Sequence, residues 1–147
     1  MVALNRLTRK KLGELLIEQG LLNEQQVQDT LRMQHQTGKL FGECLVENKL
    51  ITEDKMLGVL VSQFGIPYVK PSDYKIPKEL LEIFEPAMMR RYQFVPLDSM
   101  GSVLVIAIAG MLSEDILKEI ETQTGCSLQV FLTRMSEINN VLAANGL

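Results

Sequence analysis

Apolar residues recur every three or four positions over residues 11–64, which is the spacing of one buried face of an α-helix. Glycines interrupt this pattern at Gly20 and Gly38, and glycine commonly ends a helix. Asn23 and Thr52 stand where helix N-caps are expected, each followed by polar or acidic residues. We therefore predict two similar units, each a short helix, a break and a longer helix.

The period changes after residue 65. Residues 66–77 hold three of the five prolines and are typical of an extended linker. Beyond it we expect short helices at 78–84 and 87–91, strands at 92–97 and 103–109 joined by residues 98–101, a helix at 114–124, a strand at 127–132, and a last helix that starts at Thr133 or Ser136. The second half of the chain is thus predicted to run ββαβα.

The predicted fold class is α+β, with a helical subdomain of two helix-pair repeats ahead of a small ββαβα subdomain. The expected domain limits are 1–65 for the helical double repeat, 66–77 for the linker and 78–147 for the α+β part.

The two helical units are copies of one 24-residue pattern, at residues 11–34 and 40–63, with a five-residue spacer between them. Aligned without gaps, the copies share eight identical residues, among them Gly13/Gly42 and Leu16/Leu45. Two copies of one unit suggest pseudo-symmetry, and pseudo-symmetry suits a ligand or partner that is itself two-fold.

Composition narrows the function classes. The chain has 147 residues and a formal net charge of −3, so nothing global attracts it to nucleic acid or to anionic lipid. Cys44 and Cys126 lie far apart in sequence, which fits a reducing cytosol. The longest apolar run, 103–109, is too short to span a bilayer, and the N-terminus lacks a signal-peptide core. We expect a cytoplasmic protein that binds no nucleic acid and is not itself membrane-embedded.

Catalytic and metal-binding patterns are not found in the sequence. The Thr37-Gly38-Lys39 segment lacks the upstream glycine and the following Ser or Thr of a phosphate-binding loop. One histidine and two distant cysteines argue against a zinc site. We therefore expect neither enzyme activity nor a metal or cofactor.

The double motif resembles the MshEN-type domain, the N-terminal domain of the ATPases that drive type II secretion and type IV pilus assembly. That family has two tandem 24-residue motifs, each with an arginine, a Leu-Gly pair, two aliphatic pairs, a second glycine and a closing glutamine. Copy one matches almost throughout, with Lys11 in place of the arginine. Copy two departs at two positions, where Leu40 replaces the arginine and Lys49 the second glycine. The resemblance extends over nearly the whole chain, and the catalytic ATPase domain that normally follows is not part of the sequence.

The resemblance implies cyclic di-GMP as the ligand, with one motif copy for each half of it. It implies that the ligand-binding residues are Arg9, Lys10, Lys11, Leu12, Gly13, Leu16, Ile17, Gly20, Leu21, Leu22, Gln34, Lys39, Leu40, Phe41, Gly42, Leu45, Val46, Lys49, Leu50, Ile51 and Gln63. These residue types suit the ligand: glycines permit close approach, aliphatic side chains can cover guanine faces, lysines near a helix N-terminus favour phosphate, and glutamines can pair with a guanine edge.

A second interpretation keeps the fold and removes the nucleotide. In it the aliphatic pairs are core residues, the glutamines cap or bridge helices, and the chain docks onto a cytoplasmic domain of an inner-membrane platform protein, which would recruit it to that membrane. Lys49 and Leu40 favour this interpretation, since a lysine in a left-handed conformation costs about 1–2 kcal/mol. The intact copy one favours cyclic di-GMP binding and a secretion or pilus ATPase as the partner. Lys39, next to Leu40, can replace the missing cation.

Overall fold

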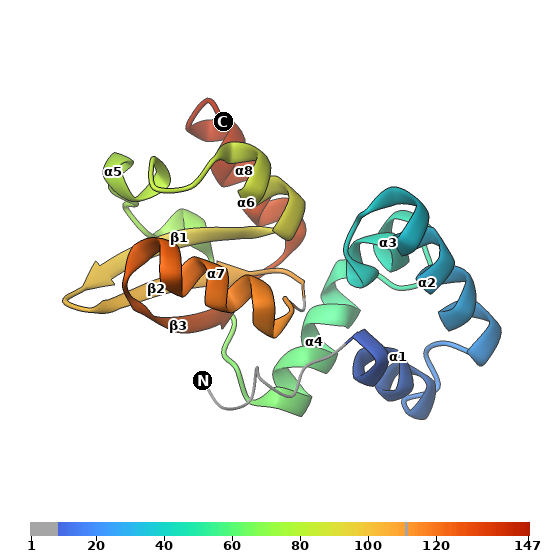
Figure 1. The fold of residues 1–147 in the computed structure, drawn as a ribbon. Coiled ribbons are helices and arrows are strands. Elements are labelled where there is room, and N and C mark those ends of the chain that lie inside the picture. Colours follow the sequence, from blue (N-terminus) through green and yellow to red (C-terminus); the bar gives the residue numbers. More distant parts are fainter. Residues whose placement is uncertain (1–8, 111) are drawn as a thin grey trace.

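The helical half of the protein confirms the predicted alternation of short and long helices. The computed structural model describes residues 9–110 and 112–147, with side chains described from residue 12 onward. The four helices of this half are α1 (Arg9–Glu18), α2 (Glu24–Thr37), α3 (Phe41–Glu47) and α4 (Glu53–Phe64). They gather on one side of the molecule, with α4 standing between the other three and the sheet (Figure 1).

The longer helices begin at the predicted caps. The side chain of Asn23 accepts a hydrogen bond from the N–H of Gln26, and the side chain of Gln26 accepts one from the N–H of Asn23. Thr52 caps α4 by accepting from the N–H of Lys55. Such caps satisfy amides that have no partner within the helix.

The connection between the short and the long helix has the same shape in both copies. Gly20 has a φ of 72° and Lys49 a φ of 58°, so both lie in the left-handed region. The amide of Gly20 donates to Ile17 O at 2.9 Å, and the amide of Lys49 donates to Val46 O at 3.1 Å. Lys49 therefore does occupy a position that favours glycine.

The second half is the predicted ββαβα arrangement, preceded by a short 3-10 helix and two short α-helices. Its elements are η2 (Pro71–Asp73), α5 (Lys78–Leu81), α6 (Pro86–Tyr92), β1 (Phe94–Met100), β2 (Val103–Ile108), α7 (Glu114–Thr124), β3 (Ser127–Leu132) and α8 (Met135–Ala144). The sheet order is β1-β2-β3, with β1 antiparallel and β3 parallel to β2. The parallel pair is joined through α7, the usual crossover for neighbouring parallel strands (Figure 1).

The first strand and its turn lie later than predicted. Tyr92 closes α6 instead of opening the strand, and Gln93 ends that helix with a φ of 53°. The strand then runs through residues 98–100, which leaves Gly101 and Ser102 as the turn. A bulge between Pro96 and Asp98 shifts the register, because proline has no N–H to donate to a neighbouring strand.

Two further boundaries differ from the prediction. The last helix begins at Met135, between the two expected starts. The N–H of its N-cap residue Arg134 donates a hydrogen bond to the Glu137 carboxylate at 3.3 Å. The segment 66–77 is also more ordered than an extended linker. Tyr68 forms a parallel bridge with Leu132, so this segment adds a short pairing to the edge of β3. The division of the chain into domains at residues 65 and 77 stays a prediction.

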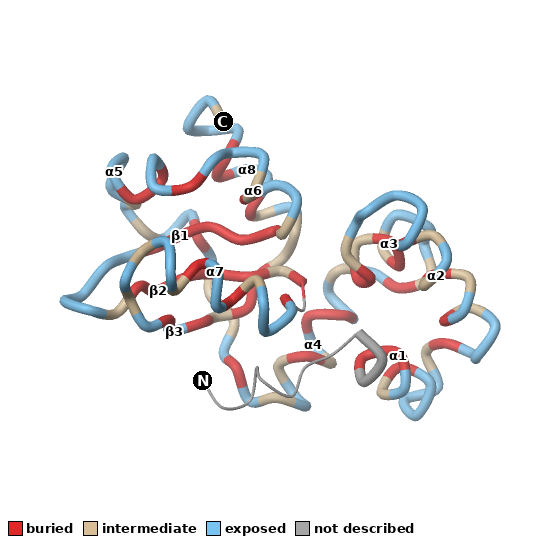
Figure 2. The backbone as a smooth tube through the Cα atoms, viewed as in Figure 1, coloured by how far each residue is buried: buried red, intermediate tan, exposed pale blue. Residues whose placement is uncertain are grey.

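One continuous core connects the two halves. Buried stretches lie on helices of the repeat and on all three strands (Figure 2). Leu16 and Leu45, at equivalent positions of the two copies, are fully buried and belong to the same cluster as the strand residues. Residues 104–108 of β2 are all buried, so both faces of the central strand are covered. No helix in the described parts of the chain combines the length and apolarity needed to cross a bilayer.

The left-handed position 49 generates a first prediction. Lys49→Gly is expected to raise the free energy of unfolding by about 0.5–1 kcal/mol, since relief of the left-handed strain exceeds the entropic cost of glycine. Lys118→Gly, within α7, is the matched control and should lower it by about 1 kcal/mol. Urea unfolding measures both, and equal effects of the two substitutions would contradict the strain argument.

Candidate functional site

The connections of the two motif copies meet at one open groove. The groove has a volume of about 830 Å³ and is lined by Leu21 of copy one together with Val46, Lys49, Leu50, Ile51, Thr52, Glu53, Asp54 and Lys55 of copy two. Five of these were predicted as ligand-binding residues, namely Leu21, Val46, Lys49, Leu50 and Ile51. Thr52 to Lys55 were not, although the first turn of α4 directly follows Ile51 and is brought to the groove by that short connection.

The chemistry of the groove is mixed. Leu21, Val46 and Leu50 are half-buried and present apolar surface, while Lys49 and Lys55 are exposed at the same groove. Flat apolar surface suits the face of an aromatic ring, and ammonium groups suit phosphate oxygens. The groove can therefore accept a ligand that carries both.

The aliphatic pairs divide their members between core and surface. Leu16 and Leu45 are buried, whereas their neighbours are not: Ile17 is exposed and Val46 is half-buried. The second pair behaves in the same way in each copy, with Leu22 and Ile51 in the core and Leu21 and Leu50 half-buried. Each aliphatic pair thus contributes one residue to the core and leaves its neighbour at least partly exposed.

The repeated glycines allow the two helices of each copy to approach. A Cβ added at Gly13 of α1 would lie 3.0 Å from Val27 Cγ1 of α2, and one at Gly42 of α3 would lie 3.0 Å from Met56 Cε of α4. Val27 and Met56 occupy equivalent repeat positions. Both glycines are buried, as are the neighbouring residues Leu12 and Phe41. Among described contacts, these four residues pack within the helical half and do not line the groove.

The closing glutamines are not equivalent in the structure. Gln34 is 8% exposed, and its Oε1 has no hydrogen-bond partner among the described residues. Gln63 is exposed on α4. Neither lines the groove, so their predicted role at a guanine edge stays a prediction.

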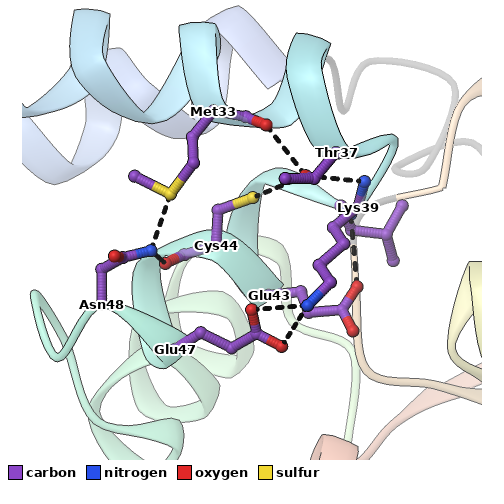
Figure 3. A network of polar contacts seen from close by, with 8 residues as sticks. Met33, Thr37, Lys39, Glu43, Cys44, Glu47 and Asn48 are labelled. Carbon is purple, nitrogen blue, oxygen red and sulfur yellow. Dashed lines mark hydrogen bonds and ion pairs between the residues drawn. The ribbon is translucent and has the colours of Figure 1, made fainter.

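The predicted cations reach different surroundings. The backbone of Arg9, Lys10 and Lys11 forms the start of α1, but their side chains lie outside the described part of the structure. Lys39 forms two hydrogen bonds to the carboxylate of Glu47, at 2.8 and 2.9 Å, which raise the pKa of the lysine (Figure 3). Its charge is therefore already matched on the surface.

Leu40, the residue in place of the motif's arginine, makes an apolar contact with the other half of the protein. A Cβ added at Gly110 would lie 2.5 Å from Leu40 Cδ1, so this glycine leaves room for the leucine. Among the described residues predicted to bind ligand, Lys49 is consequently the cation that lines the groove. Gly20, the counterpart of Lys49 in copy one, is exposed and has no side chain that could supply a charge.

A polar network fixes α2 against α3 (Figure 3). The Thr37 hydroxyl donates to Met33 O at 2.8 Å and lies 4.0 Å from Cys44 Sγ. The Asn48 amide donates to Cys44 O at 2.8 Å and contacts Met33 Sδ at 2.7 Å. Burial raises the pKa of the Cys44 thiol, which keeps it in the neutral form. This network holds the end of copy one against the start of copy two.

The first turn of α4 lines the groove and also contacts the α+β half. Glu53 Oε1 accepts a hydrogen bond from the Ser136 amide at 2.8 Å, and Asp54 is ion-paired with Arg134. The same arginine donates to the Tyr68 hydroxyl at 2.6 Å, and its guanidinium carbon lies 4.9 Å from the centre of that ring. One side of this turn faces the groove while its carboxylates contact the segment between β3 and α8.

Glu137 also contacts Arg134, with 3.6 Å between Nη1 of the arginine and Oε1 of the glutamate. Its carboxylate accepts hydrogen bonds from the Tyr68 hydroxyl and from the Thr133 hydroxyl, both at 2.7 Å. Burial by itself would raise the pKa of Glu137, but these hydrogen bonds outweigh it and hold the pKa below its ordinary value. Burial, and the hydrogen bond to Glu137, raise the pKa of Tyr68.

Comparison with known proteins identifies the family. The profile of the MshEN domain matches residues 64–145, which is more than half of the chain, and the chain therefore belongs to the MshEN domain family. The matched region is the α+β half with the end of α4. The repeat that suggested the family from the sequence lies ahead of this match.

Two curated relatives are type IV pilus assembly ATPases named PilB. The protein from Myxococcus xanthus is 22% identical over 132 residues, which cover 90% of this chain and 23% of the relative. The protein from Thermus thermophilus is 27% identical over 136 residues, which cover 91% of this chain and 15% of the relative. The chain thus spans less than a quarter of either relative.

Solved structures confirm the α+β fold. The N-terminal domain of XpsE superposes with a TM-score of 0.71 at 17% identity, covering 94% of this chain and 96% of that one. The structure of MshE with cyclic di-GMP superposes with a TM-score of 0.64 at 20% identity, covering 90% and 96%. At such identities the likeness establishes the fold alone.

The glycine contacts predict different costs of substitution. Gly13→Ala is expected to be more destabilising than Gly42→Ala by about 1 kcal/mol, because the β-branched Val27 is held in one rotamer whereas the end of Met56 can move aside. Urea unfolding of the two variants tests this. Gly58→Ala is the control, since a Cβ there meets nothing within 4 Å. A larger loss at Gly42 would contradict the packing argument.

The lowered pKa of Glu137 predicts a pH-dependent contribution to stability. Because the folded-state pKa is depressed, the ionised carboxylate stabilises the protein above the ordinary value of 4.5, and this contribution is lost as the pH falls through the folded-state pKa. Glu137→Gln should therefore lower stability at neutral pH, and the difference from wild type should shrink below pH 4.5. Thermal unfolding across pH measures this, with the exposed Glu119→Gln as control. A difference independent of pH would exclude the carboxylate charge as its cause.

Proposed function

We propose that this chain is a regulatory nucleotide-binding module that binds cyclic di-GMP in the groove between the two motif connections. The observation that carries the proposal is the meeting of Leu21 of copy one with Val46, Lys49 and Leu50 of copy two in one groove. A two-fold ligand needs a surface supplied by both copies, and this groove is such a surface.

The groove chemistry supports the ligand class. Cyclic di-GMP has two guanine bases and two phosphates. The half-buried leucines can cover a base, and the exposed amines of Lys49 and Lys55 can approach phosphate oxygens. MshE, which shares the fold, has been solved with cyclic di-GMP, and this supports the same ligand class here. Lys11 and Gln34 are proposed as further contacts from copy one.

Position 49 would then exchange stability for a cation. Copy one has glycine at the equivalent left-handed position, and copy two has a lysine there at a conformational cost. A strained residue that lines a binding surface is a common exchange of stability for function. The strain is consistent with a role for the amine, and a purely structural connection would favour glycine.

A docking module is the second candidate. It would bind a cytoplasmic domain of a secretion or pilus inner-membrane platform protein without nucleotide. The observation that favours docking without nucleotide is the state of copy two, where Leu40 is packed against Gly110 and Lys39 is paired with Glu47. Neither then supplies the cation that the motif normally places there.

Calorimetric titration of the chain with cyclic di-GMP, with GTP as the control ligand, distinguishes the two. Binding of cyclic di-GMP and not of GTP is expected. Lys49→Ala should weaken it by about tenfold, corresponding to about 1.4 kcal/mol, while leaving the left-handed strain in place because alanine also has a Cβ. Lys118→Ala in α7 removes a charge away from the groove and should leave affinity unchanged. Absence of binding by the wild-type chain would overturn the nucleotide proposal in favour of docking.

A further inference from the structure

The groove carries opposing charges that a bound anion must contend with. Lys49 and Lys55 line it, but so do the acidic residues Glu53 and Asp54. A ligand with two phosphates would meet repulsion from these carboxylates of about 1 kcal/mol or more at close range. The groove therefore needs something that keeps both carboxylates from facing the ligand.

The α+β half supplies it. The Ser136 amide donates to Glu53 Oε1 at 2.8 Å, and the guanidinium of Arg134 is ion-paired with Asp54. Arg134 is the N-cap residue of α8 and Ser136 lies in its first turn, so both donors stand about 80 positions further along the chain. Each of these two acidic residues thus has a hydrogen-bond donor from the α+β half.

Arg134 is the better fixed member of its ion pair. Its side chain is 30% exposed, whereas that of Asp54 is 76% exposed. The guanidinium also donates to the Tyr68 hydroxyl at 2.6 Å, lies over the Tyr68 ring, and is 3.6 Å from Glu137. Tyr68 in turn donates to Glu137 at 2.7 Å. The position of Arg134 is therefore fixed by Tyr68 and Glu137, and the position of the exposed Asp54 carboxylate depends on its pairing with this arginine.

We infer that Arg134 is a positioning residue of the groove, which holds Asp54 away from an anionic ligand and offsets its charge; this rests on the proposed function. Arg134 itself does not line the groove. It acts through Asp54, and it makes the α+β half part of the binding machinery of the helical repeat. Such a contact is reciprocal, so an anion in the groove strengthens the hold of α4 on the β3–α8 segment. Ligand occupancy is thereby communicated to the half of the protein that does not touch the ligand.

The test is calorimetric titration of cyclic di-GMP into the full 147-residue chain at low ionic strength. Arg134→Gln is expected to weaken binding by about five- to tenfold, because it releases Asp54 and leaves its charge uncompensated at the groove. The loss should diminish as salt is added, since the repulsion is screened. A role in packing alone would give a loss insensitive to salt.

A second substitution separates charge from structure. Asp54→Asn in the Arg134→Gln background is expected to restore most of the affinity, and in the wild-type background to change it little. Arg134→Lys keeps the charge and should retain more affinity than Arg134→Gln, which provides the test if the glutamine variant unfolds. Arg32→Gln is the matched control, because Arg32 pairs with Asp29 at 3.5 Å on the exposed face of α2 and does not line the groove.

The outcomes are distinct. Failure of the wild-type chain to bind cyclic di-GMP overturns the proposed function together with this inference. Binding by the wild type with equal affinity of Arg134→Gln and Arg32→Gln overturns the inference alone. So does a double variant in which the two substitutions act additively, because additivity means that Arg134 does not act through Asp54. Rescue by Asp54→Asn supports the inference.

Discussion

The left-handed residue between the short and the long helix of each copy determines where everything else lies. At Gly20 and at Lys49 the chain reverses within two residues, and the amide hydrogen bonds of the two turns are nearly the same. Because the turns match, the two helix pairs present matching connections, and these meet at one groove. The close contact of each repeated glycine with the neighbouring long helix then sets the angle within each pair.

The aliphatic pairs of the two motif copies contribute both to the core and to the surface. In each aliphatic pair one residue is buried and its neighbour is half-buried or exposed, and this division repeats in both copies. The arrangement explains why a pattern of apolar pairs is compatible both with a core and with a ligand surface. It also places the candidate site directly on the hydrophobic core, so that displacement of the groove residues is resisted by the packing of Leu16, Leu22, Leu45 and Ile51.

Contact between the halves gives the site a second support. The first turn of α4 lines the groove and is bound by Arg134 and the Ser136 amide, while Leu40 at the start of α3 fills the space left by Gly110. These contacts are specific to copy two. Leu40, which stands in place of the motif's arginine, packs against Gly110 of the α+β half, so copy two contacts that half at this position. The matched profile covers the α+β half, so family membership and candidate site fall on different parts of one chain.

The sequence by itself determined the repeat, the four helices, their caps and the ββαβα order, because these depend on local periodicity, on capping side chains and on glycine. It placed the first strand two residues early and left the start of the last helix open between Thr133 and Ser136, since a bulge beside Pro96 and a cap supported by Glu137 depend on neighbouring strands and side chains. The sequence also nominated motif positions for the site without separating those that face the core from those that face the groove. Only the tertiary structure decided which of these residues face the core and which face the groove. Gly13 and Gly42 pack against the neighbouring long helices, and Lys39 pairs with Glu47 on another element. Asp54 pairs with Arg134, which is distant along the chain.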